Sequence, residues 1–176
     1  MKIVAFGASN SKNSINKTLA HYAASLFQNS ETELLDLNNY QVPTYNIDIE
    51  LENGIPENCK AFNDKLLAAD LIIISFASHN GSYTAAYKSI FDWATRINQK
   101  VFDGKSLLFL STSPGPGAAK NVAEMAVASA PYFGGIVKGT FSLPEFHKNF
   151  DIAISDFSNL ELKNELKNIV SQINLI

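Results

Sequence analysis

The chain has 176 residues, 46% of them hydrophobic, and a formal net charge of −3 at pH 7. This size and composition predict a single domain over residues 1–176 that buries a core of its own. Because Lys and Arg form no cluster, neither nucleic acid nor an anionic membrane is an expected partner, and any bound anion should be small and held locally.

The first predicted elements are a strand, a polar loop and a helix. An apolar run at residues 3–6 breaks into small and hydroxylic residues, and a helical pattern begins at Ser14. The free N–H groups and the positive dipole end of a helix N-terminus attract anions, and Ser and Asn side chains add donors. We therefore expect a bound phosphate here, although Ser14 is also a good helix N-cap and could serve the helix alone.

The same alternation continues to the end of the chain. Five apolar runs are predicted strands, at residues 3–6, 33–37, 71–75, 107–111 and 136–141. Helices are predicted at residues 14–27, 55–67, 85–97 and 118–130, and in a last helix with one face made of Leu162, Leu166, Ile169, Val170 and Ile173. Five strands and five helices in strict alternation predict a three-layer α/β fold with a five-stranded parallel sheet.

Three loops of this predicted sheet carry unusual residues. They follow strands one, three and four, at residues 7–13, 76–83 and 112–117. Ligands of open parallel sheets bind at the carboxyl ends of the strands near the switch point, where these loops could converge. The long connection over residues 38–54 should lie on the same edge.

The cysteine and histidine content gives no metal or redox site. Cys59 is the only cysteine, and a small buried hydrophobe is favoured over a reactive thiol. The histidines, His21, His79 and His147, lack the short spacings of zinc ligands. The first strand begins at the N-terminus without a signal-like or membrane-spanning apolar segment, so we expect a cytoplasmic protein.

Two of the loops match motifs of a known family. The first loop fits the pattern Gly-Ser-x-Arg-x-x-Ser-x-Asn at Ser9, Ser14 and Asn16. The loop after strand three and the following helix match a second motif, in order and spacing, at Asn80, Gly81, Ser82, Tyr83, Lys88, Asp92 and Trp93. The chain therefore resembles the NAD(P)H-dependent FMN reductase family of the flavodoxin-like fold over nearly its full length.

The chain also departs from these motifs. Ala8 replaces the family's Gly, and Ser11 stands at the position of its Arg, with Lys12 beside it. A lysine supplies charge to a phosphate but not a bidentate fork. In the second loop, residues 77–79 replace Pro-Glu-Tyr, whereas residues 80–83 are intact.

The resemblance implies bound FMN and reduction by NADPH or NADH, with electrons passed to a small acceptor such as a quinone or free flavin. It also implies a homodimer or homotetramer. Because the chain has no second Gly-rich fingerprint, one pocket should serve both substrates in a ping-pong mechanism, with no catalytic acid or base. The candidate cofactor-binding residues are Ser9, Ser11, Lys12, Ser14, Ile15, Asn16, His79, Asn80, Gly81, Ser82, Tyr83, Ser111, Thr112, Ser113 and Gly115.

Several alternatives stay open. His79 is more simply a solvated loop residue, Lys88 and Asp92 an exposed helical pair, and Trp93 a core or interface residue. The predicted helix 118–130 is apolar on nearly every face, which suits a subunit contact or burial between sheet and neighbours equally well. The competing functions are a flavodoxin-like electron carrier without nicotinamide activity and a non-catalytic α/β module.

Overall fold

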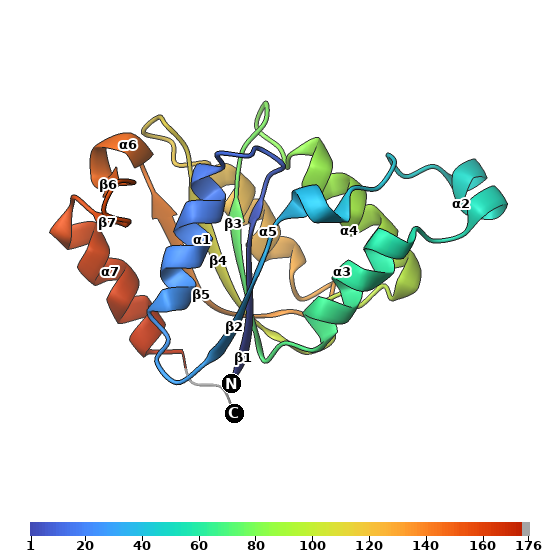
Figure 1. Ribbon diagram of the computed structural model, residues 1–176, viewed down its shortest axis with the longest axis horizontal. Helices are drawn as coiled ribbons and strands as arrows, with labels where there is room; N and C mark the ends of the chain where they lie inside the picture. Colours follow the sequence, from blue (N-terminus) through green and yellow to red (C-terminus); the bar gives the residue numbers. More distant parts are fainter. Residues whose placement is uncertain (174–176) are drawn as a thin grey trace.

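In a computed structural model of the chain, which describes residues 1–173, five parallel strands form one sheet in the order β2-β1-β3-β4-β5 (Figure 1). The strands are β1 (Lys2–Ala8), β2 (Glu31–Leu35), β3 (Leu71–Phe76), β4 (Ser106–Thr112) and β5 (Ile136–Leu143). The predicted five-stranded parallel sheet of the flavodoxin-like α/β fold is confirmed, and this strand order has its switch point between β1 and β3.

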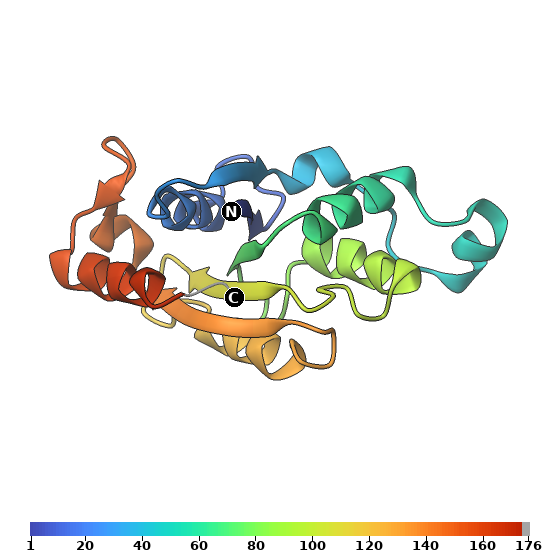
Figure 2. The ribbon, with the colours of Figure 1, turned by 90° about the horizontal axis from the view of Figure 1, so that it is seen from below.

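Helices cover both faces of the sheet, as the view from below shows (Figure 2). One face packs against α1 (Ile15–Ser25) and α7 (Leu160–Ser171). The other packs against α3 (Glu57–Leu67), α4 (Ala85–Ile97) and α5 (Lys120–Ser129). The resulting three layers bury every residue of β3, which explains why its sequence is a continuous apolar run and not an alternating one.

The prediction that strands and helices alternate strictly is wrong in two regions of the chain. The connection after β2 contains η1 (Leu37–Tyr40) and α2 (Ile47–Asn53), and the segment after β5 contains α6 (Phe146–Asn149) and a hairpin of β6 (Phe150–Asp151) and β7 (Asp156–Phe157). These elements are short, so they lack the repeated apolar positions by which longer elements are recognised. None of the residues of α2 is buried.

The α2 segment projects as an arm at the right of Figure 1. Trp93 Nε1 donates to the Pro43 carbonyl at 2.8 Å, and the indole meets the Tyr45 ring edge-on. Arg96 Nε lies 2.9 Å from Glu50 Oε2 of the arm. Trp93 is thus a fully buried core residue, as one of the open alternatives held, and it also anchors the arm.

Predicted boundaries shift where capping residues intervene. The second strand ends at Leu35 and not at residue 37, because the Asp36 side chain caps η1. The helix predicted from residue 118 begins at Lys120, since Ala118 and Ala119 have φ angles of 53° and 55°. Ser14 precedes α1 as its N-cap.

Cys59 is fully buried in α3, and burial raises the pKa of its thiol to about 11. The prediction of a small buried hydrophobe at this position is confirmed. Within residues 1–173 no helix is long and apolar enough to cross a membrane, and no group of three or more His, Cys, Asp or Glu side chains could hold a metal ion.

Candidate functional site

The three loops singled out in the sequence leave one edge of the sheet. β3 lies between β1 and β4, and Ala8 is paired with Phe76, which is paired with Ser111. The loops that follow these strands therefore begin side by side, along the top of Figure 1. This edge contains the switch point, where ligands of such sheets bind.

Asn16 ties this edge together. Its Oδ1 accepts from Ser75 Oγ at 2.7 Å and from the Thr112 N–H at 3.1 Å, and its Nδ2 donates to the Thr112 carbonyl at 3.1 Å. Only 2% of Asn16 is exposed. The amide group thus joins α1 to β3 and β4. Because this side chain is engaged in structural bonds, the Asn16 N–H in the first turn of α1 is the group that suits an anion.

The first loop presents hydroxyl donors. Ser14 Oγ accepts from the Lys17 N–H at 3.1 Å, so the N-cap interpretation is confirmed, and Ser9 Oγ accepts from the Ser11 N–H at 3.2 Å. Each hydroxyl keeps its own O–H donor. The close approach of α1 to β1 depends on Gly7, because a Cβ there would lie 2.4 Å from the Lys17 nitrogen.

Two lysines lie at the first loop, and only one of them is in an ion pair in the part of the chain that the structure describes. Lys17 Nζ lies 2.7 Å from Asp36 Oδ2, and burial raises the pKa of Asp36 less than hydrogen bonds from Lys17 and Asn38 lower it. The pKa of this carboxyl therefore falls below its usual range. Lys12 is exposed and forms no ion pair within the described part of the chain. It is accordingly the available cation beside Ser11.

The loop after β3 is a two-residue hairpin turn. The N–H of His79 donates to the Ser82 carbonyl at 3.0 Å, and the N–H of Ser82 donates back to the His79 carbonyl at 3.2 Å. Asn80 and Gly81 have φ angles of 53° and 80°, as a type I′ turn requires. Residues 79–82 are all exposed, so the turn and His79 with it face the solvent in this structure.

Tyr83 and Thr84 return the turn to the core. The Tyr83 ring packs against Phe76 and Tyr87 at centroid distances of 5.6 and 5.2 Å. Burial raises the pKa of Tyr83, while the nearby Ser129 side chain acts in the opposite direction. Thr84 Oγ1 donates to the Ala8 carbonyl at 2.9 Å and caps α4, so the third-strand loop is fastened to β1.

The loop after β4 contributes mainly backbone. Ser111 Oγ is 2.9 Å from Ser142 Oγ, and Thr112 Oγ1 donates to the Leu143 carbonyl at 2.7 Å. Both side chains are buried and engaged with β5, which leaves little for a ligand. Ser113 Oγ donates to the Gly115 carbonyl at 3.1 Å, and a Cβ on Gly115 would meet no atom within 4 Å. Space is therefore open above this loop.

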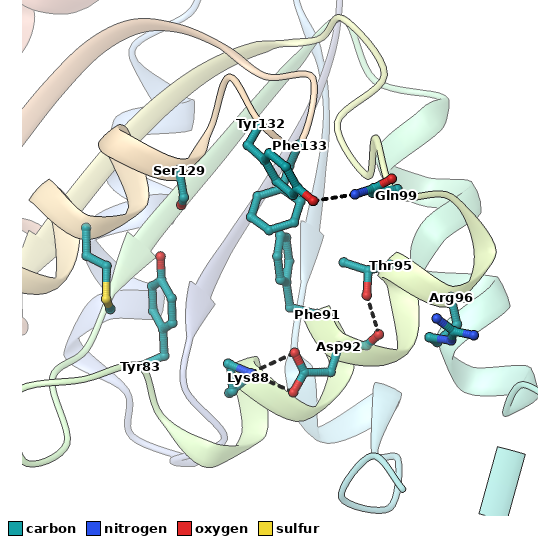
Figure 3. Close-up of a pocket in the computed structure, with 11 residues that line it drawn as sticks. Tyr83, Lys88, Phe91, Asp92, Thr95, Arg96, Gln99, Ser129, Tyr132 and Phe133 are labelled. Carbon is teal, nitrogen blue, oxygen red and sulfur yellow. Dashed lines mark hydrogen bonds and ion pairs between the residues drawn. The ribbon is translucent and has the colours of Figure 1, made fainter. Parts of the chain in front are cut away.

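Two cavities flank the site. One, of about 630 Å³, lies between α4 and α5, and Tyr83, Phe91 and Phe133 form part of its wall (Figure 3). Lys88 and Asp92 also line it as an ion pair with Nζ–Oδ1 at 2.7 Å, which confirms the predicted helical pair. The other, of about 220 Å³, adjoins the first loop and has walls from η1 and the first turns of α4.

Sequence reasoning missed four residues that organise the edge: Lys17, Ser75, Thr84 and Asn121. Thr84 precedes the predicted helix and could have been found as an N-cap. The others act through partners far away in the sequence: Asn121 Nδ2, for example, donates to the Gly81 carbonyl at 2.9 Å from 40 positions further along the chain. Nothing in the local sequence indicates such a pair.

The donor set fits a phosphate-bearing ligand with a flat ring. Hydroxyls, helix N–H groups and Lys12 lie at the first loop, and none of the fifteen candidate residues is a carboxylate. A Cβ on Gly81 would meet only the Asn121 side chain, at 3.7 Å, so a ring could approach this backbone closely. The residues present therefore suit FMN.

Comparison with known proteins agrees with this chemistry. A family model described as NADPH-dependent FMN reductase matches residues 1–148. An uncharacterised protein of Mycoplasma pneumoniae is 33% identical over 149 residues, which span 81% of this chain and 86% of that protein. An NADPH:quinone oxidoreductase of Arabidopsis thaliana is 29% identical over 125 residues, 69% of this chain and 62% of the plant enzyme.

Solved structures show the same fold. FerB of Paracoccus denitrificans, a flavoenzyme NAD(P)H:(acceptor) oxidoreductase, superposes with a TM-score of 0.76 over 97% of this chain and 93% of its own, at 22% identity.

Proposed function

Because this chain belongs to the NADPH-dependent FMN reductase family, we propose that it binds FMN at the β1-β3-β4 edge and uses NADPH or NADH to reduce a small acceptor. Quinones and free flavin are the acceptor classes we propose. The observation that carries the proposal is the meeting of a hydroxyl-rich helix N-terminus and an exposed Asn-Gly turn at the switch point. We further propose that residues 1–176 act as one domain.

The first loop would hold the phosphate. The O–H groups of Ser9, Ser11 and Ser14 and the N–H groups of Ile15 and Asn16 lie at the N-terminus of α1, where the helix dipole favours a negative group. Lys12 would add charge from the rim. This arrangement needs no bidentate side chain.

The loops after β3 and β4 would border the ring. Residues 79–82 supply an exposed backbone, Tyr83 supplies an aromatic edge, and Ser113 and Gly115 form the opposite wall. When bound, FMN would accept a hydride from the nicotinamide and give it to the acceptor. The chain needs to orient the reactants and supplies no acid or base; burial raises the pKa of Tyr83, so its hydroxyl stays protonated at neutral pH.

The decisive experiment is the visible absorption spectrum of the purified protein, before and after anaerobic NADPH or NADH. We expect a flavin spectrum that bleaches on addition of the nicotinamide. A flavin spectrum that does not bleach would favour the electron-carrier alternative. A protein that neither retains FMN nor binds added FMN would contradict the proposal. That result would favour the alternative of a non-catalytic α/β module.

We predict ping-pong kinetics. No second nucleotide-binding fingerprint exists in the sequence, so the nicotinamide and the acceptor should occupy the same opening in turn. Double-reciprocal plots at several acceptor concentrations should be parallel, and high acceptor should compete with the nicotinamide. Intersecting lines would refute a shared opening.

We also predict a homodimer or homotetramer. The inner face of α5 is buried, but its outer face is not, and Met125 and Tyr132 beside the larger cavity are 39% and 59% exposed. An aromatic cavity with exposed apolar side chains at its edge suits a subunit contact. Light scattering at micromolar concentration should give a multiple of 19.3 kDa. A monomer at that concentration would contradict this prediction.

Replacing Gly81 with Val should abolish FMN binding and turnover. A β-branched residue is strained at a φ of 80°, and its side chain would stand where the ring approaches. Gly81→Asn separates the two causes, because Asn tolerates positive φ better than other side chains but still places a side chain where the ring approaches. FMN content and steady-state rates measure the difference. Full FMN content and turnover in Gly81→Val would show that residues 80–83 are not the flavin platform.

A further inference from the structure

The turn at Asn80 and Gly81 stands clear of the sheet. Its two internal hydrogen bonds join His79 and Ser82 to each other, and all four residues are exposed. These bonds define the shape of the turn but not its tilt relative to the sheet. The tilt depends on how the turn is attached to its neighbours: Thr84 fastens the end of the loop to β1, and a second element contacts the turn itself.

That element is α5, which touches the loop at two places. Asn121, in the first turn of α5, donates from Nδ2 to the Gly81 carbonyl at 2.9 Å. At the other end of the helix, Ser129 faces the Tyr83 hydroxyl, which points toward it in Figure 3. The turn is therefore bonded to the first turn of α5, and Tyr83 lies near the last residue of the same helix.

The bond from Asn121 fixes one particular peptide group. The Gly81 carbonyl is held by Asn121, and the N–H of the same peptide, which belongs to Ser82, is held by the His79 carbonyl. A peptide plane bonded at both ends cannot rotate without breaking one of these bonds. The preceding peptide, which carries the Gly81 N–H, hinges on this fixed plane.

We propose that Asn121 is a positioning residue, which holds the Gly81–Ser82 peptide toward α5 and so presents the turn to the isoalloxazine ring. This inference rests on the proposed function. Neither motif of the family resemblance includes Asn121, and its side chain is exposed, so it adds little to the core. Its contribution is to the orientation of the loop.

The test compares three variants with the wild type. Asn121→Ala removes the donor, and Asn121→Asp keeps the shape but cannot donate. Asn58→Ala is the matched control, because Asn58 Nδ2 also donates to a loop carbonyl, that of Gln41, at 2.9 Å from an exposed position. FMN binding is measured by quenching of flavin fluorescence, together with the bound flavin spectrum, its midpoint potential and the unfolding midpoint of the FMN-free protein.

We expect both Asn121 variants to weaken FMN binding roughly 2- to 10-fold, the factor that follows from one neutral hydrogen bond. The bound flavin spectrum and the midpoint potential should also shift. Asn58→Ala should leave affinity, spectrum and potential unchanged, and its unfolding midpoint should move no less than that of Asn121→Ala.

If Asn121→Ala keeps the FMN affinity, the flavin spectrum and the midpoint potential of the wild type, the role inferred for Asn121 is overturned. The proposed function would not be affected by that result. An equal loss of affinity in Asn58→Ala would also overturn it, because the effect would then be general. Failure of the wild type to bind FMN would instead contradict the proposed function, and the inference with it.

Discussion

Replacing Gly7 with Ala is expected to displace α1 and to eliminate tight FMN binding. A Cβ at this position would lie 2.4 Å from the Lys17 nitrogen, 2.8 Å from its Cα and 2.9 Å from the Asn16 carbonyl carbon. All three are backbone atoms of α1, so no side-chain rotation relieves the clash. The first turn of the helix must move away from β1, and the proposed phosphate donors move with it.

The expected loss of stability is roughly 1–3 kcal/mol, as for other overpacked sites. Urea denaturation and FMN titration measure the two effects. Gly117→Ala is the control, because a Cβ there meets no atom within 4 Å and its φ is not positive. A Gly7→Ala protein with wild-type stability and affinity would contradict the close packing of α1 on β1.

Asn16→Ala should destabilise the protein by roughly 2–4 kcal/mol, since each buried polar group left without a partner costs about 1–3 kcal/mol. The truncation removes three hydrogen bonds and leaves Ser75 Oγ and both backbone groups of Thr112 without this partner. FMN affinity should fall as well, because the first turn of α1 loses its connection to β3 and β4. Chemical denaturation and FMN titration check both expectations.

Asn63→Ala provides a matched control. Asn63 is also 2% exposed, but its Oδ1 has no hydrogen-bond partner among the described residues. Its truncation therefore removes a buried amide without breaking a bond to that oxygen, and should cost much less. Equal losses in the two variants would mean that the Asn16 network contributes nothing beyond side-chain volume.

The sequence predicts the elements of this fold well where the local pattern decides them. The apolar run of β3 suits a covered parallel strand, and the helix at residues 85–97 has the predicted bounds because Thr84 caps its start. The arm with α2 and the β6–β7 hairpin were missed, since elements of two to seven residues show no periodicity.

The candidate site is predictable in position but not in its detailed roles. Ser9, Ser14 and the turn at Asn80 could be placed because they follow predicted strands. The engagement of Asn16, Ser111 and Thr112 within the sheet could not, because each bonds a residue from 31 to 96 positions away. The local sequence pattern does not predict such long-range pairs. Only the folded structure shows which polar groups are left without an internal hydrogen bond and could bind a ligand.

The bond between Asn16 and Thr112, 96 residues apart, also sets an order of events during synthesis. The hydroxyl-rich loop leaves the ribosome before β2, β3 and β4, yet β1 is flanked by β2 and β3, and the Asn16 amide reaches its last partner only in β4. A nascent chain that ends before β4 therefore lacks the hydrogen bonds that complete the surroundings of the proposed phosphate site. Binding of the proposed FMN should accordingly be a late step of biogenesis, after most of the sheet has been translated.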